Sequence, residues 1–191
     1  MRRRLFVLCL AAVWSAPTSA QRLLLTPADL ERIENGAAAH RWMAAARDAI
    51  VQAARGFPAD HLQKYGLREW SVPPEGGQWT LWYVCPVHGV SLRFVPPSTH
   101  QCPVDNQTIA DKKLDQVIYS RRNSDNAAAA RDNGLAYQFT KDPAFARNAA
   151  TILLAYADAY AGYPIHDTQG RPVSYTHLRA HETPEHLVCR L

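Results

Sequence analysis

Apolar residues recur at the spacing of an α-helix in the part of the chain that follows residue 20. Thr26 stands directly before a proline, which is typical of a helix start, and Asn35-Gly36 is expected to end or break this helix. A second helix is predicted over residues 37–55, with Gly56 at its C-terminal end. We expect the buried face of this second helix to consist of Trp42, Ala45, Ala46, Ala49 and Ala53. The small side chains on this face predict close packing against another helix.

The pattern becomes that of β-structure in the middle of the chain. Residues 57–77 are rich in proline and glycine and predict an irregular link. Residues 78–84 are aromatic and branched, and residues 90–94 alternate between apolar and polar, so each run predicts a strand. The sequence therefore predicts a small β-rich insert over residues 66–123, after an N-terminal helical segment over residues 21–65.

Helical spacing returns after residue 124. Asp125 is a predicted N-cap, and Asp142-Pro143 marks the start of a further helix that ends at Gly162. The apolar positions of that further helix are Phe145, Ala149, Ile152, Leu153, Tyr156, Ala157 and Tyr160. Two helices joined by a short link form an antiparallel αα-hairpin, which we expect over residues 124–172. Because one hairpin cannot bury both of its faces, we expect a mainly α protein in which the hairpin belongs to a larger helical array.

Residues 1–20 have the parts of a secretory signal peptide. Three arginines precede an apolar run over residues 5–14 that is too short to span a bilayer, and small residues follow before Gln21. The leucine before Cys9 does not suit a lipoprotein signal. We therefore expect cleavage before Gln21 and a periplasmic or secreted protein that is not attached to a membrane afterwards.

Residues 173–191 are expected to be an artefactual tail. Their sequence resembles the in-frame translation of a transposase-type sequencing adaptor, over residues 173–183 and again, after an index, over residues 186–191. The alternative is a genuine polar tail whose histidines bind metal, namely His177, His181 and His186. An adaptor origin predicts that this segment does not pack in a common core with the rest of the chain.

The net charge is much smaller when residues 1–20 and 173–191 are left out. The formal charge is +4, from 21 basic and 17 acidic residues. Five of the basic residues and two of the acidic ones lie in residues 1–20 and 173–191, so the remaining chain is nearly neutral. Bulk charge therefore gives no reason to expect a nucleic-acid partner. The apolar content of 47% is that of a globular protein.

Two short motifs in the β-rich insert carry the clearest chemistry. They are Cys85-Pro86-Val87-His88-Gly89 and Cys102-Pro103-Val104-Asp105-Asn106. A turn of this kind points backbone N–H groups at the first sulfur, and glycine or asparagine at its end suits a positive φ. Zinc takes thiolate, imidazole and carboxylate ligands in a tetrahedron. The sequence therefore predicts a structural zinc site, with the ligands Cys85, His88, Cys102 and Asp105.

Three alternatives remain open for this pair of motifs. Asp105 is the weakest of the four ligands, and His100 is a substitute for it. A secreted protein also favours a disulfide between Cys85 and Cys102, which is worth about 3 kcal/mol for a loop of this length. Free thiols are the third alternative. A catalytic zinc is not expected, because a site closed by four side chains leaves no open position.

Two other polar groups have both a functional and a plain structural interpretation. His166-Asp167 could form an acid–base dyad, although a loop histidine after a helix is the simpler interpretation. Arg121-Arg122-Asn123 could meet an anionic sugar or form an ordinary charged surface before a helix. The sequence contains no GxSxG, phosphate-loop or HExxH motif.

Several short motifs follow one another in a familiar order. The signal peptide over residues 1–20 and the N-terminal helical segment come first. The motifs then lie at residues 82–89, 100–105, 131–137, 142–146, 152–157 and 163–167. This order resembles the N-terminal part of the heparinase II/III-like polysaccharide lyases, the group that includes oligo-alginate lyases. The resemblance covers most of residues 22–171. The family usually has a second cysteine or histidine where this chain has Asp105.

The resemblance implies the start of an (α/α) toroid, followed in a longer chain by β-sandwich domains. It also implies β-elimination on uronate-containing glycans, which needs a group that neutralises the carboxylate, a Tyr or His base, and an acid. In the family these groups lie mainly on later helices, so no catalytic residue is assigned here. We expect an N-terminal fragment of a secreted lyase, inactive alone, whose partner is an anionic polysaccharide or oligosaccharide. The alternative is a non-catalytic secreted helical module with a structural zinc knuckle, which contacts glycans through Trp79 and Trp82.

Overall fold

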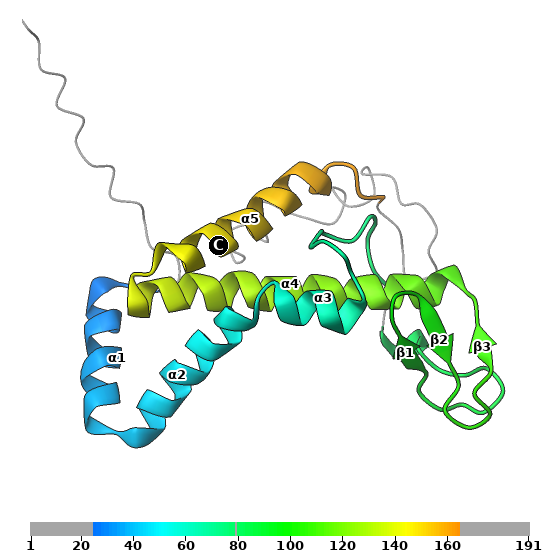
Figure 1. The fold of residues 1–191 in the computed structure, drawn as a ribbon, viewed down its shortest axis with the longest axis horizontal. Coiled ribbons are helices and arrows are strands. Elements are labelled where there is room, and N and C mark those ends of the chain that lie inside the picture. The colour runs from blue at the N-terminus through cyan, green and yellow to red at the C-terminus, as the bar shows by residue number, and fades with distance from the viewer. Residues whose placement is uncertain (1–24, 79, 165–191) are drawn as a thin grey trace, which may run out of the picture.

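The computed structural model describes residues 25–78 and 80–164, which are mainly helical with a small antiparallel sheet (Figure 1). The helices are α1 (Pro27–Ala39), α2 (Arg41–Gly56), α3 (Ala59–Tyr65), α4 (Lys112–Thr140) and α5 (Pro143–Tyr160), with a 3-10 turn, η1, over Thr80–Trp82. The strands β1 (Arg93–Val95), β2 (Thr99–Gln101) and β3 (Thr108–Ile109) pair in the order β1-β2-β3. The expectations for the leader, for Trp79, for His166-Asp167 and for the tail lie outside the described residues.

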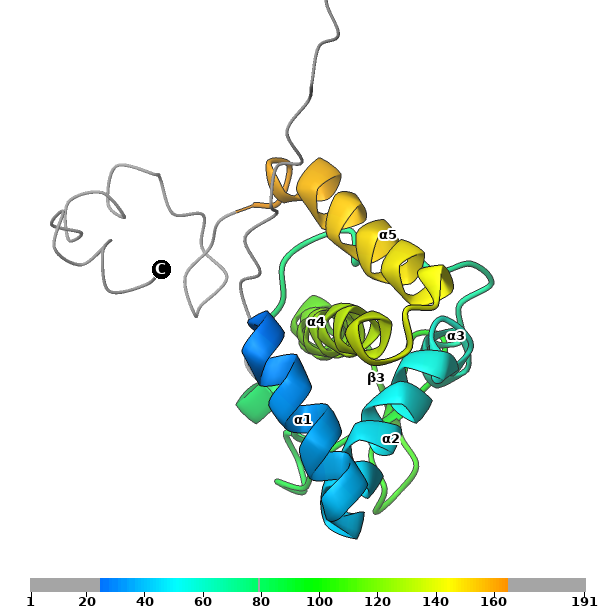
Figure 2. The same cartoon turned by 90° about the vertical axis from the view of Figure 1, so that its left-hand side faces the viewer.

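Helix α4, with 29 residues, is the axis against which α2, α5 and η1 pack, whereas α1 packs against α2 (Figure 1, Figure 2). The α2 and α5 helices lie along its C-terminal half, and the sheet lies beside its N-terminal end (Figure 1). Lys141, with a φ of 59°, turns the chain from α4 into α5. The side chain of Asp142 then accepts a hydrogen bond from the N–H of Ala144 at 2.9 Å, which caps α5. The αα-hairpin and its capping residue are therefore confirmed.

Three apolar clusters fix these elements in place. The first joins the β-rich insert to the N-terminal part of α4 and consists of Tyr65, Tyr83, Cys85, Leu92, Cys102, Leu114, Val117 and Ile118. The second joins α2 to the α4–α5 hairpin and consists of Val51, Ala54, Ala136 and Phe145. The third consists of Phe57, Ala129 and Ile152. Because the first cluster contains both cysteines, the two candidate sulfur ligands belong to the core of the protein.

A chain of polar side chains crosses the contact between α4 and α5. The indole N–H of Trp70 donates to Asn126 at 3.1 Å, and the amide of Asn126 donates to the hydroxyl of Tyr156 at 3.0 Å. That hydroxyl in turn donates to Asn123 at 2.6 Å. Asn126 is buried, and its carbonyl and amide groups both have partners. A satisfied buried network of this kind selects one register between the two helices.

The start of α1 agrees with the sequence, but three other helix predictions are wrong. The side chain of Thr26 accepts a hydrogen bond from the N–H of Asp29 at 3.2 Å, which completes a capping box. Helix α1 nevertheless continues through Asn35-Gly36 to Ala39. Residues 57–77 also contain α3, and Asp125 lies in the middle of α4 instead of at its start. The carboxylate of Asp125 accepts hydrogen bonds from Lys64 and Tyr65 of α3, so it makes a tertiary contact and does not cap a helix.

The predicted buried face of α2 is wrong. Trp42, at 70% exposed, lies on the open side together with the four alanines named with it. The buried residues of α2 are Val51 and Ala54, which lie on the adjacent stripe. Alanines line both stripes, so the spacing alone could not select the face that meets α4.

The β-rich insert has less regular structure than predicted. Residues 78–84 do not form a strand, because Thr80–Trp82 is a 3-10 turn and Val84 makes only an isolated bridge to Ser91. The strand predicted over residues 90–94 is instead Arg93–Val95, which pairs antiparallel with β2. Trp82 and Tyr83 of the first run pack against α4, and this contact stabilises that part of the run without a ladder of hydrogen bonds.

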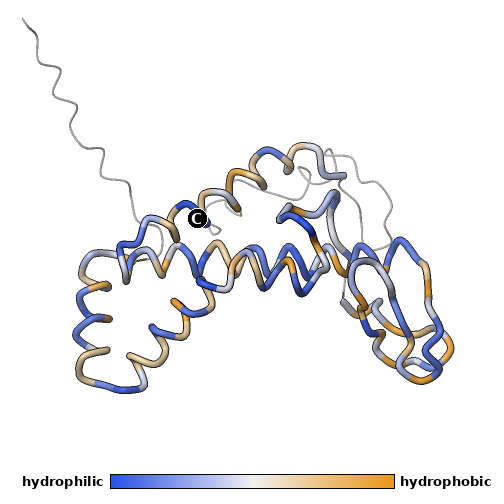
Figure 3. The backbone as a smooth tube through the Cα atoms, viewed as in Figure 1, coloured by the Kyte–Doolittle hydropathy of each residue, from blue (hydrophilic) through white to orange (hydrophobic). Residues whose placement is uncertain are grey.

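Helix α5 buries only part of its apolar face. Phe145 and Ile152 are buried, whereas Leu153 and Tyr160 are 62% and 73% exposed. Figure 3 shows that hydrophobic positions are frequent along this helix. Among the described residues, no helix is both long enough and apolar enough to cross a membrane.

Candidate metal centre

The two cysteine motifs fold into turns of the same design. In the first, the N–H of Gly89 donates to the carbonyl of Cys85 at 2.8 Å. In the second, the N–H of Asn106 donates to the carbonyl of Cys102 at 2.9 Å. Gly89 and Asn106 have φ values of 65° and 61°, as the sequence predicts for the last residue of each turn. Each turn therefore places its cysteine sulfur on the inside of a tight bend.

The turns bring three metal-binding side chains together. The ligand atoms of Cys85, His88 and Cys102 all lie within 4.8 Å of one another. Nδ1 of His88 lies 3.6 Å from Sγ of Cys85 and 3.4 Å from Sγ of Cys102. Both cysteines are buried free thiols, and the side chain of His88 is 30% exposed. This group could bind a metal ion.

The separations fit the edges of a tetrahedron around zinc. Zn–S bonds of about 2.3 Å and Zn–N bonds of about 2.0–2.1 Å, at a tetrahedral angle, give an S···N edge of about 3.6 Å. The two S···N distances in the cluster are 3.6 Å and 3.4 Å. These two S···N separations are therefore compatible with one ion bound by His88 and both sulfurs.

Asp105 lies beside this group. Its Oδ2 is 3.8 Å from Nδ1 of His88, and its Oδ1 accepts a hydrogen bond from the N–H of Gln107 at 3.0 Å. A zinc ligand pair of this type has an O···N edge of about 3.4 Å, and Asp105 is not part of the group whose ligand atoms all lie within 4.8 Å of one another. The hydrogen bond from Gln107 is the largest of the effects that lower the pKa of Asp105, which keeps this candidate ligand ionised.

The pKa values of the two thiols are shifted in opposite directions, because backbone donors dominate at Cys85 and burial dominates at Cys102. The N–H of His88 points at Sγ of Cys85 at 3.5 Å, and this contact does most to lower the pKa of Cys85 to about 7. Burial raises the pKa of Cys102, which outweighs the backbone N–H groups of Val104 and Asp105 that favour its thiolate. Cys85 is therefore the sulfur that is ready to bind a metal ion near neutral pH.

His100 is not available as the substitute ligand. Its Nδ1 lies 2.8 Å from the hydroxyl of Tyr83, and its Nε2 lies 2.9 Å from Oδ1 of Asp115. The ring is 2% exposed, so both nitrogens are occupied by buried or half-buried partners. The alternative set of ligands with His100 in place of Asp105 is therefore wrong.

The structure also gives Arg122 an unexpected position. One of the two interpretations of Arg121-Arg122-Asn123 is a charged surface before a helix, but these residues lie within α4, and the other interpretation, contact with an anionic sugar, stays a prediction. Arg122 is 8% exposed and donates to the carbonyl of Ser71 at 2.9 Å. Its guanidinium also lies 5.8 Å from the ring centre of Tyr65. The apolar pattern contained no sign of this burial, because it depends on loop residues far away in the sequence.

Trp82 has a structural role. The ammonium group of Lys113 lies 4.1 Å from the centre of its indole ring, a cation–π contact between η1 and α4. The indole also packs against the first apolar cluster. One face of this aromatic ring is therefore covered within the protein.

Comparisons of the chain with known protein families, with curated proteins and with solved structures found no match.

Proposed function

We propose that Cys85, His88, Cys102 and Asp105 hold a structural zinc ion that joins the two cysteine turns of the β-rich insert to each other, beside α4. The observation that carries the proposal is the convergence of three zinc-type donors from two turns of the same design, within 4.8 Å of one another. Four protein ligands would close the coordination sphere, which is typical of a structural ion and leaves no position for a substrate. The ion would therefore stabilise the fold and would not perform chemistry.

The surroundings of the cluster support a structural role for the ion. Cys85 and Cys102 belong to the same apolar cluster as Leu114 and Val117 of α4. The insert has only short strands, of two or three residues each. So little regular structure provides few backbone hydrogen bonds, and small domains of this kind usually need a metal or a disulfide. A zinc ion at the cluster would supply that crosslink.

The proposal is tested by unfolding the purified chain with and without a metal chelator. We expect removal of zinc to lower the melting temperature and to increase proteolysis within residues 80–111 first. Cys85→Ser should reproduce the effect of the chelator, and His40→Ala, which changes an exposed histidine at the start of α2, should not. An unchanged melting temperature with chelator would contradict the structural zinc.

We further propose that this helical module is part of a secreted lyase that cleaves uronate-containing glycans by β-elimination. The support is the resemblance in the order of motifs, together with the α4–α5 hairpin, whose exposed Leu153 and Leu154 suit further helical pairs. An (α/α) toroid is an array of such pairs. The catalytic base and the group that neutralises the carboxylate would then come from later pairs.

The parent gene provides the test of the lyase proposal. A reading frame that continues beyond Arg171 into further αα-hairpins, and an expressed long protein that forms unsaturated uronate product, would support it. A stop codon directly after Arg171 in the parent gene would instead favour the non-catalytic zinc-containing module. The assay follows the near-ultraviolet absorbance of the unsaturated product on alginate and on heparin, with a neutral glucan as the control substrate.

A further inference from the structure

The two sulfurs of the candidate metal centre are free thiols that lie close to each other. The Sγ atoms of Cys85 and Cys102 are within 4.8 Å of one another, and neither cysteine is in a disulfide. A tetrahedral zinc ion holds two sulfurs about 3.8 Å apart, whereas a disulfide bond holds them about 2.0 Å apart. These two crosslinks exclude each other, because a sulfur that has entered a disulfide is no longer a thiolate ligand.

Either crosslink would join the same two segments of the insert. Cys85 lies in the turn that ends at Gly89, and Cys102 lies in the turn that ends at Asn106. The strands of the insert have only two or three residues each, so the insert depends on a link between these turns. A disulfide that replaced the ion would therefore keep the two turns joined.

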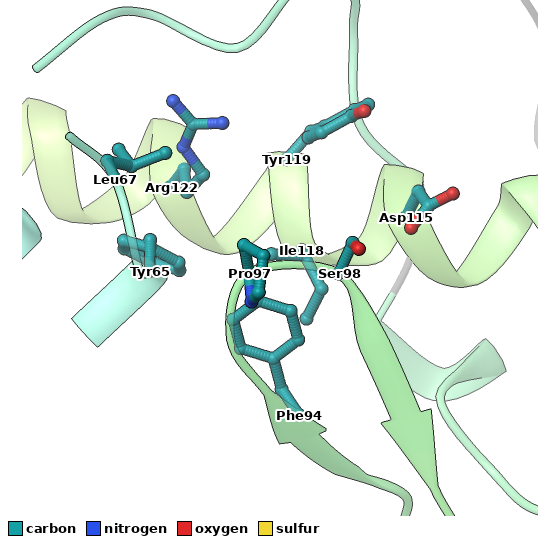
Figure 4. A pocket seen from close by; sticks show the side chains of 9 residues that line it. All are labelled: Tyr65, Leu67, Phe94, Pro97, Ser98, Asp115, Ile118, Tyr119 and Arg122. Atoms are coloured by element: carbon teal, nitrogen blue, oxygen red, sulfur yellow. The ribbon is translucent and has the colours of Figure 1, made fainter. Parts of the chain in front are cut away.

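The exposed side of the cluster is formed by His88 and Asp105. Their side chains are 30% and 33% exposed, whereas Cys85 and Cys102 are 3% and 0% exposed. The imidazole of His88 lies next to both sulfurs, with Nδ1 at 3.6 Å and 3.4 Å from them. The small pocket between α4 and the β1–β2 hairpin is a separate feature, because none of its lining side chains is a candidate zinc ligand (Figure 4). We therefore expect a small oxidant to reach the sulfurs past His88 and Asp105.

We propose that the candidate metal centre is a redox switch, in which hydrogen peroxide converts the zinc-bound thiolates of Cys85 and Cys102 into a disulfide and releases the ion. The proposal rests on the structural zinc and adds how that site is regulated. The zinc-bound state is the resting state, and the disulfide forms when peroxide is present. Oxidation also frees His88 and Asp105 from the metal, so the exposed surface that they form differs between the two states.

The reaction consumes one molecule of peroxide for each disulfide. One thiolate attacks the peroxide, so an S–O bond forms, the O–O bond breaks, and the departing hydroxide takes up a proton and leaves as water. The second thiolate attacks the sulfenic acid that results, so an S–S bond forms, the S–O bond breaks, and a second water leaves in the same way. The two sulfurs lose the two electrons that the peroxide gains. The zinc ion leaves with its charge unchanged.

The first experiment treats the zinc-loaded chain with a small excess of hydrogen peroxide and follows zinc release with a chromophoric indicator. We expect complete release of the ion, a loss of two hydrogens in the intact mass, and a peptide that links Cys85 to Cys102. A thiol reductant should reverse these changes and restore zinc binding. Cys189→Ser, which removes a cysteine outside the described residues, is the matched control and should release zinc to the same extent.

Limited proteolysis in the presence of a chelator tests whether the disulfide replaces the ion as a crosslink. The oxidised chain should be cleaved within residues 80–111 at least about tenfold more slowly than the reduced, metal-free chain, because its two turns stay joined. Equal rates of cleavage would overturn this part of the proposal.

Three further results would overturn the redox switch and leave the structural zinc in place. Peroxide could leave the ion bound, it could release the ion without a link between Cys85 and Cys102, or the oxidised chain could fail to rebind zinc after reduction. The last result would show irreversible oxidation to sulfinic acid. A reduced chain that binds no zinc before peroxide is added would instead contradict the structural zinc itself.

Discussion

Nε2 of His100 lies 2.9 Å from Oδ1 of Asp115, and this contact joins β2 to α4. On the other side of the ring, Nδ1 faces the hydroxyl of Tyr83 at 2.8 Å. With the hydroxyl donating to Nδ1 and the Nε2–H donating to the carboxylate, one neutral tautomer satisfies every group. His100 is two residues from Cys102, so this network also holds the second cysteine turn against the helix.

Replacement of His100 tests that relationship. His100→Phe fills a similar volume but leaves the hydroxyl of Tyr83, which is buried, without its partner. We expect the free energy of unfolding to fall by about 1–3 kcal/mol, measured by urea denaturation of the zinc-loaded chain. His40→Phe, at an exposed position, is the control and should have little effect. Equal stabilities for the two variants would show that the network contributes nothing.

The α4–α5 contact makes a second prediction. Ile152 is 1% exposed in the third apolar cluster, whereas the neighbouring Leu153 is 62% exposed. Ile152→Ala should therefore destabilise the chain by about 2–5 kcal/mol. Leu153→Ala, an equally large truncation on the same helix, should cost less than about 1 kcal/mol. Thermal unfolding of both variants checks the difference, and a larger loss for Leu153→Ala would mean that α5 packs through its other face.

The sequence allowed good predictions wherever a local interaction decides the structure. The caps at Thr26 and Asp142 and the positive φ values of Gly89 and Asn106 depend on residues within a few positions of each other. The grouping of Cys85 with Cys102 could also be predicted, because two turns of one design on neighbouring segments imply a shared ligand. These features need no knowledge of the distant packing.

The failures concern packing between distant segments. Helix α4 begins earlier than the sequence predicts, because Asp125 has the chemistry of an N-cap but its carboxylate binds Lys64 and Tyr65, about sixty residues away in the sequence. The burial of Arg122 depends in the same way on Ser71. The residue types along one helix do not predict which distant loop packs against it.

The depressed pKa of Cys85, to about 7 from its ordinary 9.0, gives a prediction for the metal-free chain. Between these two pH values the unfolded chain binds more protons at this position than the folded chain does. The contribution of Cys85 to folding stability is therefore fully present above about pH 9 and is lost as the pH falls through 7. Thiolate absorbance of the Cys102→Ser variant, which leaves Cys85 as the only thiol of the first apolar cluster, should titrate with a midpoint near 7. A midpoint near 9 would contradict the role of the backbone N–H of His88.

Asp105 is the candidate ligand whose replacement should raise the affinity for zinc. Because thiolate is a softer and stronger zinc ligand than carboxylate, Asp105→Cys should raise the affinity for zinc, and Asp105→Ala should lower it about 10- to 100-fold. Competition with a chromophoric chelator measures both changes. Asp158→Ala, which removes an exposed acid from α5, is the matched control and should not alter the affinity. If Asp105→Ala binds zinc as tightly as the unmodified chain, water or another group is the fourth ligand.

The most direct test of the structural zinc is the metal content of the purified chain, measured by native mass spectrometry and inductively coupled plasma mass spectrometry on the same sample. We expect one zinc ion per chain. Cys85→Ser and Cys102→Ser should lose this ion, and His40→Ala should keep it. A chain without metal, whether its two sulfurs are free or joined in a disulfide, would contradict the structural zinc site.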